Sequence, residues 1–254
     1  GVYYLIFAMI GFGLNNGLQT LIARRAGENK PEEVGKLFGQ GVYISLAIAF
    51  VGILITWLLA PVILKTVLHS DTIATDSIEY LKIRIWGLPF LFVYQMRNAL
   101  LVGTNNSKYL ISGAIAETVA NVAFDYFFIF GHYGFPEMGL NGAAVASIIA
   151  EFIGMLVVFL VIHKKGIGKQ FSLFKHFYWN KKLSKQLFAI SLPIILQLAF
   201  SVMSWEFFYI LIEHHGQTDL AISNVMRNVF GLTGCLTWAF AATSSAMVSN
   251  IIGQ

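Results

Sequence analysis

Six ionisable side chains lie inside stretches of the chain that are otherwise apolar: Arg97, Glu117, Asp125, Glu151, Glu206 and Arg227. An ionised group at the centre of a lipid bilayer costs at least about 2.5 kcal/mol. Such a group therefore marks an ion or substrate pathway, or it pairs with an opposite charge. These six residues are the first candidates for function in this chain.

Glu117, Asn121 and Asp125 follow one another at intervals of four residues. On a helix this spacing places all three side chains on one face, one turn apart. Carboxylate and amide oxygens suit a hard monovalent cation or a proton relay. The same apolar stretch contains no basic residue that would neutralise them. We therefore predict a cation-coupling site at Asn121 and Asp125, with Na+ as the only metal ion expected there.

Glu206 is the second candidate for cation coupling. At about 1.5 Å of helical rise per residue, Glu206 and Asp125 both lie roughly 9 Å below the outer ends of their apolar stretches. Arg227 enters the last apolar stretch at a similar depth. The alternative for Glu206 is therefore a structural ion pair with Arg227.

The other polar residues in apolar stretches are interpreted as cavity or relay residues: Glu117, Glu151, Gln197 and Arg227. Each has a structural alternative. Glu117 and Glu151 fall near the middle of the bilayer, where a carboxyl group can instead be protonated and pack neutrally. Gln197 can also serve as an interhelical hydrogen-bonding group, and Arg97 is close enough to a helix end to extend its charge to the membrane surface.

The elements that carry these residues are predicted to be transmembrane helices. Of the 254 residues, 57% are hydrophobic and only 12% charged, with a mean hydropathy of +0.69. A soluble domain has about 25% charged residues, so the composition indicates an all-α, polytopic membrane bundle. About 20 apolar residues span the hydrocarbon core, and seven stretches reach this length. They are 1–22, 37–61, 83–104, 109–131, 139–162, 187–212 and 220–251.

Basic residues gather in alternate connections between these stretches, which predicts that residue 1 lies outside and Gln254 on the cytoplasmic side of a bacterial inner membrane. The longest connection, 163–186, has seven lysines and no acidic residue. We interpret it as an amphipathic linker on the cytoplasmic leaflet, between a lobe at 1–162 and the start of a second lobe at 187–254. Gly1 stands in an apolar run without an initiator Met, so further helices are expected at both ends.

Other classes of protein fit less well. Cys235 is the single cysteine, and neither an HExxH helix nor a GxSxG turn is present, so we expect neither an enzyme nor a cofactor. The basic residues follow the loops instead of one solvated face, so nucleic acid is not an expected partner. A seven-helix receptor or retinal protein agrees with the helix count, but the last stretch offers no lysine for a Schiff base.

Four segments together resemble the multidrug and toxic compound extrusion (MATE) transporters, over essentially the whole chain. They are IARRAGENK at 22–30, ETVANVAFDYFFIFG at 117–131, FPEMGLNGAAVAS at 135–147 and SLPIILQLAFSVMSWEFFYILIEHHG at 191–216. The resemblance implies a monomeric exporter of twelve helices in two six-helix lobes, of which this chain holds helices two to eight. It also implies that Asn121 and Asp125 belong to one cation site and Glu206 to a second. The acidic partners from helix one and from a later helix are absent here.

The function expected from these features is export of hydrophobic or cationic small molecules by Na+ or H+ antiport, through alternating access. Burial would raise the affinity of the carboxylates for protons if H+ is the coupling ion. A flippase for lipid-linked oligosaccharides or peptidoglycan precursors, from the same superfamily, is the alternative. Its cavity would need several basic residues, whereas only Arg97 and Arg227 lie deep within the predicted spans, Arg84 being the second residue of its stretch.

Overall fold

The chain is almost entirely helical in the computed structural model, which describes residues 2–67, 71–173, 175, 178–213 and 217–254. No strand occurs among these residues, and seven of their helical segments are long and apolar enough to cross a membrane. The predicted all-α fold with seven spans is therefore confirmed. The helices are α1 (Val2–Gly27), α2 (Pro31–Val67), α3 (Asp71–Arg84), α4 (Leu88–Gly103), α5 (Leu110–Phe130), α6 (Gly139–Lys164), α7 (Ile167–Gln170), α8 (Lys181–Glu213) and α9 (Gln217–Gly253), with short 3-10 turns at Ile85–Gly87, Ser107–Tyr109 and His132–Gly134.

The third span begins earlier than the sequence analysis predicted. It runs from Ala74 to Gly103 and consists of α3, a 3-10 turn and α4, instead of starting at residue 83. Ala74, Ile78 and Leu81 are buried at helical spacing, although the segment around them is polar. Their apolar side chains hold α3 against α2 and α6, so tertiary packing extends the helix into a segment that was interpreted as a loop.

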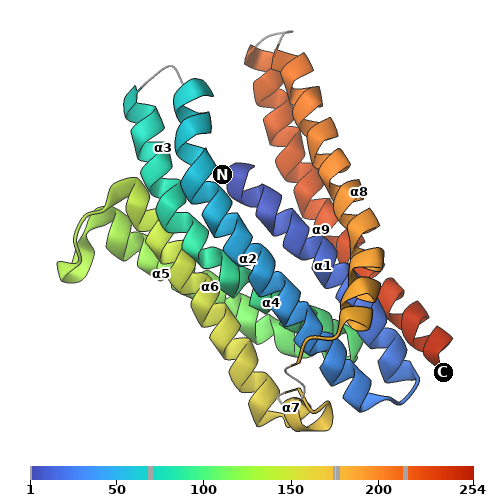
Figure 1. The fold of residues 1–254 in the computed structure, drawn as a ribbon. Coiled ribbons are helices and arrows are strands. Elements are labelled where there is room, and N and C mark those ends of the chain that lie inside the picture. Colours follow the sequence, from blue (N-terminus) through green and yellow to red (C-terminus); the bar gives the residue numbers. More distant parts are fainter. Residues whose placement is uncertain (1, 68–70, 174, 176–177, 214–216) are drawn as a thin grey trace.

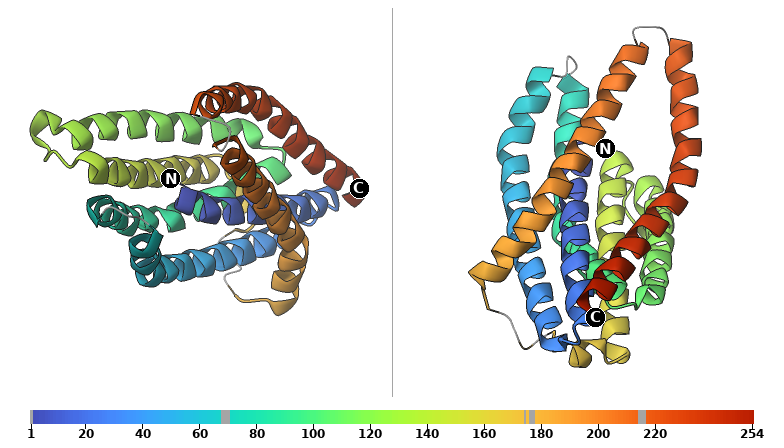
Figure 2. Two further views of the ribbon diagram at one scale, coloured as in Figure 1. Left: turned by 90° about the horizontal axis from the view of Figure 1, so that it is seen from above. Right: turned by 90° about the vertical axis from the view of Figure 1, so that its right-hand side faces the viewer.

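Helix α1 lies at the centre of the bundle and contacts α2, α4, α8 and α9 (Figure 1). Helices α5 and α6 form the most extensive helix pair and cover the side of α4 and α3 (Figure 2). Helices α8 and α9 pack against α1 near its basic end. Toward their other ends they diverge from α2 and α3 in both side views. The lower part of α1 thus joins the two groups of helices.

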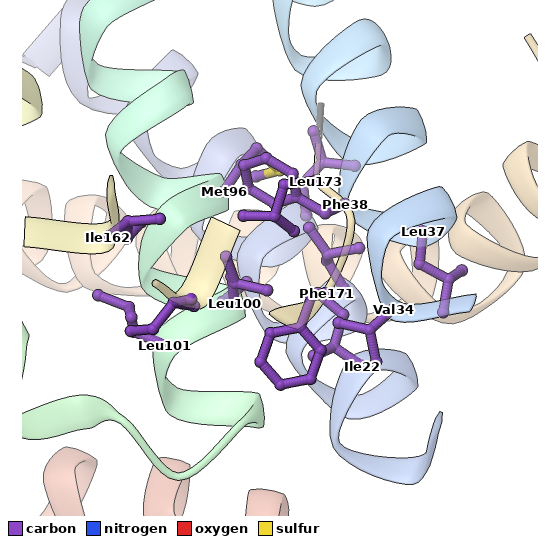
Figure 3. Packing of buried hydrophobic residues seen from close by; sticks show 14 of the residues in the cluster. Ile22, Val34, Leu37, Phe38, Met96, Leu100, Leu101, Ile162, Phe171 and Leu173 are labelled. Atoms are coloured by element: carbon purple, nitrogen blue, oxygen red, sulfur yellow. The ribbon is translucent and has the colours of Figure 1, made fainter. Parts of the chain in front are cut away.

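The connection after α6 is inserted into the bundle rather than simply lying on its surface. Phe171 and Leu173 are buried in the main apolar cluster, where they meet α1, α2 and α4 (Figure 3). Gln40 of α2 holds the following segment: its Nε2 donates to the Tyr178 carbonyl at 2.6 Å, and its Oε1 accepts from the Asn180 amide at 3.0 Å. The apolar residues Phe171 and Leu173 of this linker are thus buried inside the bundle, while its placement on the cytoplasmic leaflet stays a prediction.

Helix α8 begins at Lys181, six residues before the predicted start at 187, because Asn180 caps it. The Asn180 Oδ1 accepts hydrogen bonds from the amides of Lys182 and Leu183 at 3.0 and 3.2 Å. These are amide groups that no helical carbonyl can satisfy. The linker is thus shorter than the sequence indicated.

Two glycines allow α1 and α9 to cross in close contact at the basic end of the bundle. A Cβ atom at Gly27 would overlap the carbonyl of Asn250, and one at Gly253 would overlap the carbonyl of Arg24. Asn250 Nδ2 also donates to the Ala23 carbonyl at 3.1 Å. The contact is reciprocal, with a glycine of each helix packing against the backbone of the other.

Candidate functional site

The predicted polar stripe of α5 faces α6. Glu117 lies against Gly154, close enough that a Cβ atom at position 154 would overlap its side chain. One turn further, Asn121 Nδ2 donates to the Ser147 hydroxyl at 3.4 Å. The α5–α6 interface therefore contains an amide, a hydroxyl and carboxylates within one stripe.

Asp125 completes this stripe and has an unsatisfied oxygen. Its Oδ1 is buried and accepts no hydrogen bond from any described residue. A buried acceptor without a partner costs about 1–3 kcal/mol, so a proton or a cation at this oxygen would relieve the penalty. Asp125 lies one helical turn from Asn121, and carboxylate and amide oxygens are ligands that a hard cation prefers.

The described residues contain no group of three or more His, Cys, Asp or Glu side chains arranged to hold a metal ion. The oxygen set at Asp125 therefore supplies one carboxylate with neutral donors. Such a set suits a weakly held monovalent ion better than a transition metal. Ser147 was missed by the sequence analysis, because a serine in a membrane helix usually bonds within its own helix.

Glu151 is not a free relay group but one partner of a buried ion pair. The two terminal nitrogens of the Arg84 guanidinium donate hydrogen bonds to the two oxygens of the Glu151 carboxylate, with Nη1 lying 3.0 Å from Oε2. The Tyr4 hydroxyl donates to the same carboxylate at 3.1 Å, and the guanidinium lies 3.8 Å from the centre of the Tyr4 ring. The sequence analysis gave pairing with an opposite charge as a general alternative, but it did not identify Arg84 as the partner of Glu151.

Arg84 and Tyr4 are the residues that sequence reasoning missed in this cluster. The sequence analysis named neither Arg84, at the start of the stretch 83–104, nor Tyr4 among the candidate residues. Their partner Glu151 is 67 and 147 positions away along the chain, so no local spacing indicates the contact. The sequence does contain one indication of this contact. Arg84 lies between apolar residues in the segment KIRIWG, which predicts that its charge is paired with an acidic residue.

Arg97 binds the backbone of α6 instead of extending to the membrane surface. Its Nη1 donates to the Met155 carbonyl, and its guanidinium lies 5.1 Å from the centre of the Phe159 ring. The charge therefore remains within the bundle, between α4 and α6. The expectation that Arg97 reaches the surface is wrong.

The second predicted site is only partly visible. Glu206 lies on α8, but its side chain is outside the described residues, so the proposed pairing with Arg227 stays a prediction. Arg227 and Gln197 are exposed on α9 and α8. Gln197 precedes Ser201 by one helical turn, on the face of α8 that bears a hollow of about 420 Å³. This hollow is lined by Ser201, Ser204, Trp205 and Phe208.

At the basic end, the connection between α1 and α2 is internally neutralised. Glu28 pairs with Lys30 at 2.8 Å and with Arg24 at 3.3 Å, and also with Arg25. Arg25 in turn reaches Glu33 at 2.9 Å. The hydrogen bonds from Lys30 and Arg25 lower the pKa of Glu28 to about 2.

The helices and these polar groups define a polytopic α-helical membrane protein with charged and amide side chains inside its bundle. Many large apolar side chains on α2, α5, α8 and α9 are exposed, as lipid-facing surfaces require. Such a bundle has close relatives among known proteins.

Residues 2–127 match the sequence model of the MatE family. A probable multidrug resistance protein NorM from Synechocystis sp. is 31% identical over 199 residues, which cover 75% of this chain and 41% of that protein. A protein of the same name from Halalkalibacterium halodurans is 27% identical over 245 residues, which cover 95% of this chain and 54% of that protein. The chain spans about half the length of these curated relatives.

Solved structures give the same result for the fold. The Vibrio cholerae MATE transporter VcmN in its bent form superposes with a TM-score of 0.85 at 19% identity, over 99% of this chain and 56% of that chain. The chain belongs to the multidrug and toxic compound extrusion family. Family membership and the helices together establish a multi-pass membrane protein.

Proposed function

We propose that the full-length protein is a multidrug efflux transporter of the bacterial inner membrane, driven by Na+ or H+ entering through the α5–α6 interface. The observation that carries this proposal is the buried Oδ1 of Asp125, which lacks a hydrogen-bond donor beside Asn121. A carboxylate in this state gains more from a cation than a satisfied one does. The names of the NorM relatives support export of drugs as the driven process.

The arrangement of the helices fits one state of an alternating-access cycle. α8 and α9 contact α1 at the basic end and diverge from α2 and α3 at the other end (Figures 1 and 2). We assign the basic end to the cytoplasm, because short basic loops are retained on that side. In this assignment the outer side is the open one.

Coupling requires that the cation bind the two states with different affinities, since equal affinity shifts no equilibrium. Helices α5 and α6 pack extensively against each other, whereas α8 and α9 contact mainly α1 and, less extensively, α2 and α4. A cation at Asp125 would favour the arrangement of α5 and α6 that releases substrate outward. The cycle then needs no covalent chemistry.

The hollow on α8 fits a greasy or cationic aromatic substrate. Trp205 and Phe208 line it edge to face, with ring centres 5.9 Å apart. Ser201 and Ser204 add hydroxyls, and aromatic faces attract organic cations. We propose this face of α8, including Gln197, as part of the substrate path.

The test is export of a fluorescent cationic dye from proteoliposomes under an imposed Na+ or proton gradient. Asp125→Asn keeps the size of the side chain and removes its charge, and Asp76→Asn on the exposed face of α3 is the matched control. Glu206→Gln tests the second site, with the loop variant Glu137→Gln beside it. We expect at least a tenfold loss of gradient-driven export in Asp125→Asn and none in the controls.

Unchanged export in both Asp125→Asn and Glu206→Gln would contradict coupling at these carboxylates. If the wild type moves no dye under either gradient but flips a lipid-linked sugar, the protein is a flippase instead. A wild type that moves dye without any gradient would contradict antiport.

A further inference from the structure

The basic end of the bundle contains a hollow of about 480 Å³ where α6 ends and α7 begins. It is lined by His163, Gly168, Lys169, Ser172 and Lys175. Gly166, with a φ of 72°, turns the chain between the two helices, so that α7 folds back beside the end of α6. The hollow belongs to neither the stripe of α5 nor the face of α8 described above.

The walls of this hollow are held in place from the inside of the bundle. Ile167, Phe171 and Leu173 lie between its lining residues in the sequence and are buried in the main apolar cluster. Figure 3 shows Phe171 and Leu173 in this cluster. Lys169 is exposed between the buried Ile167 and Phe171. Lys169 therefore extends from a backbone that is held on both sides by buried residues.

The charge of this hollow is not neutralised within the described part of the chain. Among these residues, no carboxylate lies within ion-pair distance of Lys169 or Lys175. At the same end of the bundle, Glu28 and Glu33 accept ion pairs from Arg24, Arg25 and Lys30. One basic connection is thus self-neutralised, whereas the other presents free positive charge.

An apolar track leads from the membrane to this charge. Phe152, Leu156 and Leu160 of α6 are exposed at 41%, 38% and 54% and recur every four residues. His163 follows three residues later on the same face and lines the hollow. The apolar side chains thus end where the positive charges begin, in the order that a phospholipid presents its chains and its headgroup.

We propose that this hollow binds the phosphate headgroup of an anionic phospholipid, with the acyl chains lying along Phe152, Leu156 and Leu160. The shared chemistry is an anionic phosphate group, which a soluble phosphate compound also offers. The lipid is favoured because the hollow is lined mostly by apolar atoms and continues into the exposed face of α6. Basic pockets at the ends of membrane helices select anionic lipids by the same combination.

The test uses full-length protein in detergent and native mass spectrometry with added dioleoylphosphatidylglycerol. The variant Lys169→Gln/Lys175→Gln removes both charges, and Lys181→Gln/Lys182→Gln removes two charges from the start of α8 as the matched control. Each lysine near an anionic lipid contributes enough that we expect roughly thirty-fold weaker binding in the first variant and little change in the second. All four lysines are exposed, so both variants should keep the melting temperature of the wild type.

Two further arms identify the source of the phosphate. Dioleoylphosphatidylcholine, which has the same chains and no net charge, should bind at least ten-fold more weakly. Glycerol 1-phosphate, which has the charge and no chains, should not displace the bound lipid at equal concentration. The proposal is overturned if the two double variants bind phosphatidylglycerol equally weakly. It is also overturned if phosphatidylcholine binds as tightly as phosphatidylglycerol, or if glycerol 1-phosphate displaces the bound lipid at equal concentration. These outcomes do not depend on transport activity.

Discussion

Glu151 and Asp125 lie on neighbouring helices of the same bundle, yet their carboxylates have opposite surroundings. Glu151 receives hydrogen bonds from Arg84 and Tyr4, whereas Asp125 retains a buried oxygen with no donor among the described residues. A buried carboxylate that is fully paired stabilises one structure, and one that is left unsatisfied gains from a ligand. At the scale of single residues, Glu151 is therefore satisfied within the bundle, whereas Asp125 is the carboxylate that we propose for cation coupling.

Glu151→Gln should strongly destabilise the bundle. It leaves the Arg84 guanidinium buried without a counter-charge, and breaking a buried pair in this way costs about 3–5 kcal/mol. The apparent melting temperature in detergent should fall well below that of the wild type. The double variant Arg84→Met/Glu151→Met should melt closer to the wild type, because it leaves neither charge unpaired. Equal melting temperatures for the single and double variants would contradict this explanation.

Glu28 gives a pH-dependent prediction in the connection between α1 and α2. Its pKa is lowered from 4.5 to about 2 by hydrogen bonds from Lys30 and Arg25. A carboxylate whose pKa is lowered by folding stabilises the folded state above its unfolded pKa and loses this effect as pH falls through the folded value. Glu28→Gln should therefore lower the melting temperature at pH 7, and this decrease should become much smaller as the pH falls toward 2.

The control for Glu28 is Glu32→Gln, because Glu32 is exposed and forms no ion pair among the described residues. Its melting temperature should follow that of the wild type over the whole pH range. A Glu28→Gln effect that persists near pH 2 would show that the contribution of Glu28 is not electrostatic.

At the scale of helices, α1 is the element on which both groups of helices depend. It crosses α8 where Gly17 meets Ser191, and α9 where Gly27 meets Asn250. A glycine at a helix crossing lets two backbones approach closely, which is how membrane helices gain packing energy without a hydrophobic driving force. The small residues of α1 therefore fix the position of α8 and α9.

Gly17→Leu should separate α1 from α8. A Cβ atom at this position would overlap the Ser191 side chain, and overpacking of this kind typically costs about 1–3 kcal/mol. We expect a lower melting temperature in detergent. Gly231→Leu on α9 is the matched control, because nothing lies within 4 Å of a Cβ atom built there. Similar decreases in melting temperature in both variants would indicate that leucine destabilises either helix in general, and not that the close contact between α1 and α8 is lost.

At the scale of the whole molecule, the two groups of helices meet at the basic end and diverge at the other (Figure 1). In the alternating access that we propose, the end that is open closes while the end that is closed opens. The diverging ends of the helices should therefore approach one another when the basic ends separate. Spin labels at Leu58→Cys on α2 and Leu211→Cys on α8, both exposed, report the end of the bundle that we assign to the outer side. The exposed Cys235 must first be replaced by alanine.

Pulsed electron paramagnetic resonance should measure a long distance between the two spin labels when the helices are arranged as in this structure. A second, shorter distance should appear under conditions that favour inward opening. Asp125→Asn should change the ratio of the two populations, because it removes the carboxylate to which the cation would bind. A single distance under all gradients would contradict a rocking motion of α8 and α9.

The amino-acid sequence by itself determined the number and type of the membrane helices. Hydrophobicity is a local property, and a run of about 20 apolar residues is apparent without any partner. The shared face of Glu117, Asn121 and Asp125 was equally predictable, because helical periodicity alone places residues four positions apart on one face. The MATE resemblance, carried by four local segments, was confirmed for the same reason.

Only the tertiary structure decided which buried charges are paired. Arg84 and Tyr4 reach Glu151 across 67 and 147 positions of the chain, and no local pattern encodes such a distance. The same holds for Phe171 and Leu173, which looked interfacial beside their lysines but are buried among α1, α2 and α4. Packing decides these cases, because the cost of a buried charge or an exposed ring depends on neighbours that are distant in sequence.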